Sequence, residues 1–203
     1  MLQKLTILFL PFLLIGCGYT IQSSKRPPFL EKEGIKTVYL APITNNTYKP
    51  GIENVVYNEM LKRLSSNRRI KVVQNRGQAD AVLSGIVDAA YYSPGANTVA
   101  SQLYPNDKLP NFVMGSPDVL VATEYSASLS CGFSLNRNQP QPGKKQFLWS
   151  DSIGKGKSFP ATNQLGAFGT TSSLINESEF DRALRDLAEQ IAADMSESML
   201  AGF

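Results

Sequence analysis

The chain has 203 residues, with 20 Lys and Arg against 17 Asp and Glu, a formal net charge of +3 and no histidine. A net charge this small gives no reason to expect nucleic acid binding. Histidine is the commonest general base and metal ligand, so its absence argues against an enzyme and a metal site. We therefore expect no catalytic residues and no cofactor.

The N-terminus is a short apolar run, residues 5–15, behind one positive charge at Lys4. A membrane-spanning helix needs about 20 apolar residues, so residues 1–16 are predicted to be a secretory signal. The run ends in Leu-Ile-Gly-Cys, which resembles the lipobox of bacterial lipoproteins. That resemblance implies a lipid anchor on Cys17, and Gly18 after it favours the outer membrane. The alternative is an ordinary secretory signal that contains a cysteine.

The next segment, residues 17–34, is predicted to be a lipidated N-terminus and tether because it contains Pro27-Pro28 in polar surroundings. Residues 35–203 then form one α+β domain. The run IKTVYL at 35–40 is typical of a strand, and residues 41–51 are expected to be a loop. Apolar side chains four residues apart predict a helix from about Gly51 to Leu64.

Four further segments are predicted to lie in the core. A short strand is expected at residues 70–73 and a longer one at residues 80–92. The clearest strand is predicted at residues 123–135, where apolar and polar residues alternate strictly. Cys131 falls on the apolar face of that strand, so we interpret it as a buried small side chain, not a reactive thiol. The same alternation predicts a strand at 147–159.

Residues 93–119 hold four prolines and are predicted to be a long insertion loop that is functional or packs its own apolar residues over the sheet.

The last element is a helix from about Glu177 to Met199. Asn176 is expected to cap it, and the acidic residues of its first turns are interpreted as helix-dipole and solvation residues.

Basic residues form two clusters along the chain. One cluster is Arg68, Arg69 and Lys71; the other contains Lys144, Lys145, Lys155 and Lys157. Such groups could bind lipid phosphates, or they could be a solvated strand edge on which lysines discourage aggregation. We name the second cluster as candidate contacts for lipopolysaccharide phosphates.

The order of these elements resembles the LptE family of lipopolysaccharide-assembly lipoproteins. Four stretches support the resemblance: Cys-Gly-Tyr at 17–19, IKTVYLAPITNNTYKPGIENVVYNEMLKRL at 35–64, Ala-Thr-Glu-Tyr at 122–125, and ALRDLAEQIAADM at 183–195. Their order and spacing matter more than any one of them, and together they span most of the chain.

The resemblance implies two helices packed on one face of a roughly four-stranded mixed sheet, a two-layer sandwich. It also implies a non-enzymatic plug on the periplasmic side of the outer membrane, inside the β-barrel LptD, which assists barrel assembly and lipopolysaccharide insertion. The sequence departs from the family at residues 93–119 and 161–175, where lipopolysaccharide-contacting basic residues are expected and only Lys108 occurs. The alternative is a lipoprotein adaptor of another envelope secretion or barrel-assembly complex.

Overall fold

The computed structural model describes residues 29–99, 120–162 and 170–201. The elements in chain order are α2 (Phe29–Lys32), β1 (Thr37–Leu40), β2 (Thr44–Asn45), α3 (Ile52–Ser65), β3 (Lys71–Val72), the 3₁₀ helix η2 (Arg76–Gln78), β4 (Ala81–Val99), β5 (Leu120–Arg137), β6 (Phe147–Pro160) and α6 (Thr170–Ala201).

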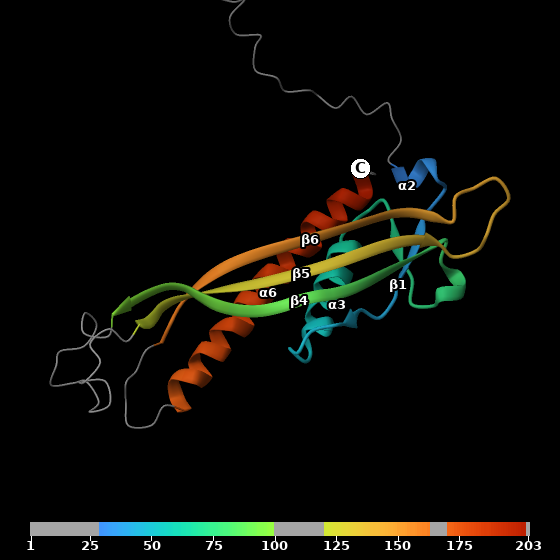
Figure 1. The fold of residues 1–203 in the computed structure, drawn as a ribbon. Coiled ribbons are helices and arrows are strands. Elements are labelled where there is room, and N and C mark those ends of the chain that lie inside the picture. The colour runs from blue at the N-terminus through green and yellow to red at the C-terminus, as the bar shows by residue number, and fades with distance from the viewer. Residues whose placement is uncertain (1–28, 100–119, 163–169, 202–203) are drawn as a thin grey trace, which may run out of the picture.

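The strands form one mixed sheet in the order β3-β1-β4-β5-β6, with β2 beside β4 (Figure 1). The short strands β1, β2 and β3 pair in parallel, whereas β4, β5 and β6 are long antiparallel neighbours. The sheet is therefore a long three-stranded antiparallel ribbon with short parallel strands near one end.

The alternation predicted for residues 123–135 is confirmed from Ala127 to Leu135, whereas residues 123–126 are all half-buried. The odd-numbered residues of β5 from Ala127 to Leu135 are buried, while the serines between them are partly exposed. Cys131 has no exposed surface, so its interpretation as a core side chain is also confirmed. Burial raises the pKa of the Cys131 thiol to about 12, and the nearby charge of Asp88 adds to the effect. The thiol is neutral at physiological pH.

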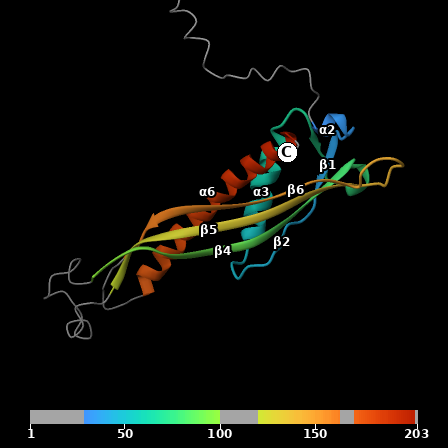
Figure 2. The ribbon, with the colours of Figure 1, turned by 45° about the horizontal axis from the view of Figure 1, so that its top comes forward.

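Helices α3 and α6 both lie behind the same face of the sheet, as two views show (Figures 1 and 2). Each helix buries one stripe of apolar side chains against the sheet. In α3 these side chains are four residues apart: Ile52, Val56, Met60 and Leu64. In α6 the stripe includes Leu187, Ile191 and Met195. These stripes and the apolar face of β5 make one continuous core. The α+β class is thus confirmed.

The predicted number of strands was wrong, because the sheet has six strands within the described residues instead of about four. Strand β3 lies within the segment predicted as a short strand, residues 70–73. Strand β2 lies within the segment predicted as a loop, residues 41–51, because two residues are too few to give an alternation in the sequence. The two-layer description is also only approximate. Residues 29–32, assigned to the tether, form the short helix α2, and Leu30 is buried in the core.

The boundary of the predicted loop at residues 93–119 was misplaced, since β4 continues to Val99. Residues 93–99 extend because β5 pairs with them as far as Leu120. Pro94 fits there because, in the described residues, no strand pairs with the other edge of β4 beyond Val87, and a proline is tolerated on such an edge. The rest of the predicted loop lies outside the described residues.

The last helix begins at Thr170, so Asn176 does not cap it. Instead, the Asn176 side chain is buried, and its Oδ1 accepts a 2.8 Å hydrogen bond from the backbone N–H of Thr162, just after β6. The cap prediction was wrong because the asparagine binds another segment of the chain. No helix in the described ranges has the length and apolar character needed to cross a bilayer.

Candidate partner-binding face

The face of the sheet opposite α3 and α6, here called the bare face, is lined by small side chains. Paired residues of antiparallel strands point to the same side, so the registers identify its members. They are Ser84, Ile86, Ala89, Tyr91 and Ser93 in β4, Ser126, Ser128, Ser130, Gly132 and Ser134 in β5, and Ser150, Ser152, Gly154, Gly156 and Ser158 in β6.

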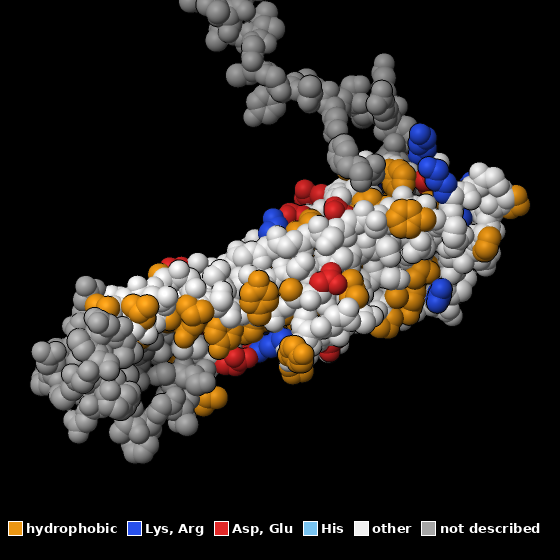
Figure 3. Space-filling view, in the orientation of Figure 1, with side chains coloured by type: hydrophobic (Ala, Val, Ile, Leu, Met, Phe, Trp, Pro, Cys, Tyr) orange, Lys and Arg blue, Asp and Glu red, His pale blue; other side chains and the backbone are white. Residues whose placement is uncertain are grey.

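None of these fifteen side chains is charged. Figure 3 looks onto this face, where white atoms predominate and charged side chains are few. Asp88, at the irregularity in β4 between Val87 and Ala89, places its carboxylate near Gly132 and so adds one charge to this face. A shallow depression of about 450 Å³ lies over Ser84, Gly132 and Ser152. A surface of small side chains with so little charge, and with a carboxylate as that charge, suits close approach of another protein backbone more than the binding of an anion.

The outer edge of the sheet at β6 adds to this surface. The backbone N–H and C=O groups of the odd-numbered residues of β6 point toward β5. The hydrogen bond from the Ala161 N–H to the Thr123 carbonyl, at 3.0 Å, shows this alternation. By alternation, the backbone groups of Ser152, Gly154 and Gly156 face outward. Within the described residues no strand pairs with that edge.

Two predicted phosphate contacts, Lys155 and Lys157, share a strand face, as expected, but that face is covered by α6. Lys155 Nζ lies 2.5 Å from a carboxylate oxygen of Asp194, and Lys157 is ion-paired with Asp186. Both lysines therefore already have anionic partners, which an incoming phosphate would have to displace.

The other two candidates, Lys144 and Lys145, are exposed in the turn between β5 and β6. Ten residues separate Lys145 from Lys155, which is roughly 33 Å along a strand. The four lysines thus do not form one site, and their role as lipopolysaccharide contacts stays a prediction.

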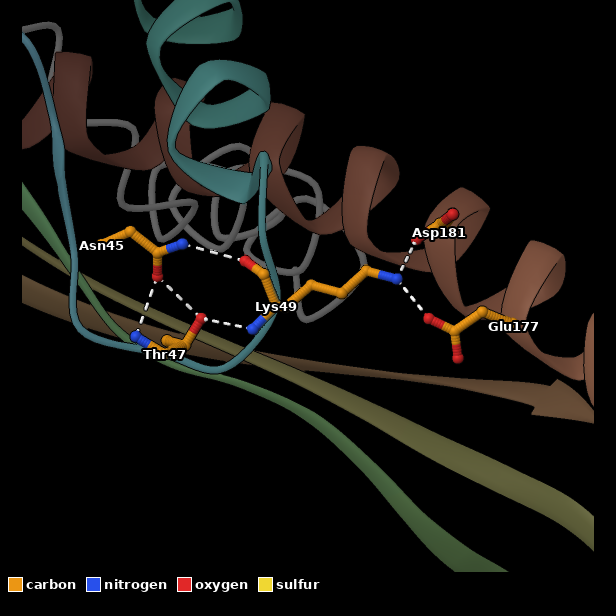
Figure 4. Close-up of polar contacts among 5 residues, drawn as sticks. All are labelled: Asn45, Thr47, Lys49, Glu177 and Asp181. Atoms are coloured by element: carbon orange, nitrogen blue, oxygen red, sulfur yellow. Dashed lines mark hydrogen bonds and ion pairs between the residues drawn. The ribbon is translucent and has the colours of Figure 1, made fainter.

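Lys49 is a third lysine that contacts α6, and its importance was missed in the sequence. Its Nζ pairs with Glu177 and, at 2.6 Å, with Asp181, and lies 5.1 Å from the ring centroid of Phe180 (Figure 4). Burial by itself would lower the pKa of Lys49. The hydrogen bonds and charges of Asp181 and Glu177 have the larger combined effect, so the pKa of Lys49 is raised above its ordinary value. The acids predicted to serve the helix dipole therefore hold Lys49.

Asn45 fixes the loop that carries Lys49 (Figure 4). Its Oδ1 accepts hydrogen bonds from the backbone and hydroxyl of Thr47, and its Nδ2 donates to the Lys49 carbonyl at 2.9 Å and to Glu53 at 2.8 Å. An asparagine two residues before a threonine is typical of an Asx turn, and this was the available sequence signal.

The cluster of Arg68, Arg69 and Lys71 makes no ion pair within the described residues. Together with Lys36 it surrounds a pocket of about 350 Å³ between α2 and the turn from α3 to β3. Lys36 precedes β1, and its contribution was missed because β1 and β3 become neighbours only in the folded sheet.

Two further charged residues hold this end of the domain. The Asp80 carboxylate accepts hydrogen bonds from the backbone N–H groups of Lys36 and Thr37, at 2.9 and 2.8 Å. Burial by itself would raise the pKa of Asp80. These hydrogen bonds and the charge of Arg137 have the larger combined effect, so the pKa of Asp80 is lowered below its ordinary value. Arg137, 3% exposed, pairs with Glu33 at 3.1 Å.

The predicted lipid-attachment residue, Cys17, lies outside the described residues. The described part of the chain contains no group of three or more Cys, Asp or Glu side chains placed to hold a metal ion.

Among solved structures, the hypothetical protein CT253 from Chlamydia trachomatis is similar, with 11% identity, a TM-score of 0.48, and coverage of 82% of this chain and 99% of that one. The rare lipoprotein B from Shewanella oneidensis has 16% identity, a TM-score of 0.43, and coverage of 79% and 92%. With TM-scores this low, neither similarity supports a functional argument.

No curated protein matches the chain. The family described as LptE, lipopolysaccharide-assembly, matches residues 35–199, which is most of the chain and nearly all of the folded domain. The matched range includes both the bare face and the helices behind it. This protein therefore belongs to the LptE family.

Proposed function

We propose that the chain is a lipoprotein, attached through Cys17 to the periplasmic side of the outer membrane, which plugs an LptD-like β-barrel. There it assists assembly of the barrel and aids insertion of lipopolysaccharide at the cell surface, without catalysing a reaction. The observation that carries this proposal is membership of the LptE family over residues 35–199.

The bare face supports the proposal physically. Its serines and glycines leave the backbone close to the surface, and its near absence of charge avoids the large cost of removing water from ionised groups. A partner such as a barrel wall could therefore approach closely over the length of β5 and β6.

Copurification tests this proposal. A C-terminal affinity tag, with outer membranes extracted in mild detergent, should recover a large β-barrel at a near one-to-one ratio. Adding charge to the bare face with Ser128→Lys and Ser130→Lys should lower recovery of the barrel at least tenfold, since two unpaired charges would be buried at the interface.

The matched control adds the same two charges at exposed positions of α6, Ser178→Lys and Gln190→Lys, and should recover the barrel normally. Equal loss in both variants would argue against the bare face as the interface. Recovery of soluble envelope proteins in place of a barrel would favour an adaptor of another envelope complex and overturn the plug role.

A further inference from the structure

The pocket beside α2, here called the basic pocket, combines an apolar floor with a basic rim. Leu30, Ile35 and Ile70 form the floor, and all three are almost fully buried. Leu200, in the last turn of α6, completes it. The volume of about 350 Å³ is in the range of small-ligand sites.

The rim consists of four exposed cations: Lys36, Arg68, Arg69 and Lys71. In the described ranges none of the four makes an ion pair, whereas Lys49, Lys155 and Lys157 all do. Glu31 is the single acidic side chain that lines the pocket. The rim thus keeps an excess of positive charge without a described protein partner.

The backbone that carries the rim is held in place. The Lys71 N–H donates to the Lys36 carbonyl at 2.8 Å, and the Arg69 N–H donates to Oδ1 of Asn67 at 2.8 Å. The Lys36 N–H in turn donates to the Asp80 carboxylate at 2.9 Å. The backbone positions of these rim residues are therefore fixed before any ligand binds, so that binding orders only their side chains.

An apolar floor with a basic rim fits an anionic amphiphile. Arginine side chains can bind a phosphate through two parallel hydrogen bonds, and lysines add point charges. The floor suits the first apolar carbons beside such a phosphate. A lipid headgroup has both parts, whereas a free anion uses only the rim.

The position of the pocket in the chain indicates which lipid surface it meets. Leu30 and Glu31 of α2 line the pocket, and α2 follows directly on the N-terminal segment. Cys17 precedes Phe29 by twelve residues, which span no more than about 43 Å even when extended. In Figure 3, Lys and Arg side chains gather at this end, near α2.

We infer that the basic pocket binds the phosphate headgroup of an anionic phospholipid in the membrane leaflet that holds the chain's own anchor. This inference rests on lipid attachment at Cys17, which is part of the proposed function. Binding would fix the α2 end of the domain against the membrane and direct the long strands away from it.

Vesicle binding tests the inference. Residues 17–203 with Cys17→Ala would be incubated with vesicles containing about 30% phosphatidylglycerol in phosphatidylcholine, at low salt, and the bound fraction measured by sedimentation. Each basic residue near such a surface contributes about 1 kcal/mol, so Arg68→Gln with Arg69→Gln should lower partitioning about 30-fold.

The matched control, Lys155→Gln with Lys157→Gln, removes the same charge from the α6-paired lysines and should change partitioning less than about threefold. Equal losses in the two variants, or equal binding to pure phosphatidylcholine, would overturn the inference. Binding only when lipopolysaccharide replaces phosphatidylglycerol would also overturn the inference.

The inference and the proposed function can fail separately. The Arg68→Gln and Arg69→Gln variant should still recover the β-barrel in the copurification experiment, because the bare face is unchanged. Normal vesicle binding without barrel recovery would contradict the plug role and leave the pocket assignment standing.

Discussion

Two sets of basic side chains in this protein have opposite environments. Lys49, Lys155 and Lys157 each pair with carboxylates of α6, and this contact between lysines and helix is here called the α6 seam. The rim cations Arg68 and Arg69, beside α2, have no such partner in the described structure.

The difference shows that the role of a basic cluster depends on which side chains lie next to it in the folded protein. The lysines of β6 cross-link strand and helix because their side of the sheet is covered by an acidic helix. The rim cations stand over an apolar pocket, where their charge is available to a ligand. The following substitutions test whether the two regions differ in this way.

The largest effect is expected from Arg137→Met, which removes the buried anchor of the basic pocket. Arg137 donates to the Glu33 carbonyl at 3.3 Å as well as to its carboxylate. Loss of these charge-assisted bonds should lower the free energy of unfolding by about 3 kcal/mol. Urea unfolding followed by the fluorescence of Trp149, the single tryptophan, measures it.

Arg182→Met is the matched control for that measurement, because Arg182 pairs with Glu179 on the exposed side of α6. It should change stability by no more than about 0.5 kcal/mol. A similar loss in both variants would mean that α2 is not held by Arg137.

A second substitution, Asn45→Ala, breaks the loop that brings Lys49 to the α6 seam. Four hydrogen bonds are lost, and we expect a cost of about 2 kcal/mol. Hydrogen exchange should rise most around residues 177–181 of α6. Asn54→Ala, an exposed neighbour with one weak side-chain bond, should leave exchange there unchanged.

Acid should weaken the pocket end through Asp80. Because the pKa of Asp80 is lowered in the folded protein, its carboxylate stabilises the fold above the ordinary pKa of about 3.9 and loses that effect as pH falls through the lower folded value. Asp80→Asn should cost about 1 kcal/mol at neutral pH, and the difference from wild type should shrink below about pH 4.

Unfolding of both proteins in urea between about pH 7 and about pH 2 would measure this dependence. Parallel stability curves across that range would mean that the Asp80 carboxylate is not bound as described.

The smallest effect is expected at the α6 seam itself. Lys155 and Lys157 are 36% and 42% exposed, so water screens their ion pairs. Replacing both with glutamine should lower the free energy of unfolding by less than about 1 kcal/mol. A loss above about 2 kcal/mol would make the seam a principal support of the fold and weaken its use as a vesicle-binding control.

The sequence predicted the elements with a long regular pattern. The alternation around Cys131 located β5, and the four-residue spacing from Ile52 to Leu64 located α3, because each pattern follows directly from backbone geometry. Elements without a pattern were missed or misplaced. Strand β2 falls within the predicted loop at residues 41–51 because two residues are too short for an alternation, and the first turns of α6 contain Asn176, a residue that is favoured just before a helix.

The sequence by itself thus determined the α+β class, the buried cysteine and the family. Only the tertiary structure decided which charges are free. Lys155 pairs with Asp194 and Lys36 joins Arg68 at a pocket because strands and helices distant in the chain become neighbours. Electrostatic interactions depend on separation in space, and the local sequence does not contain that separation.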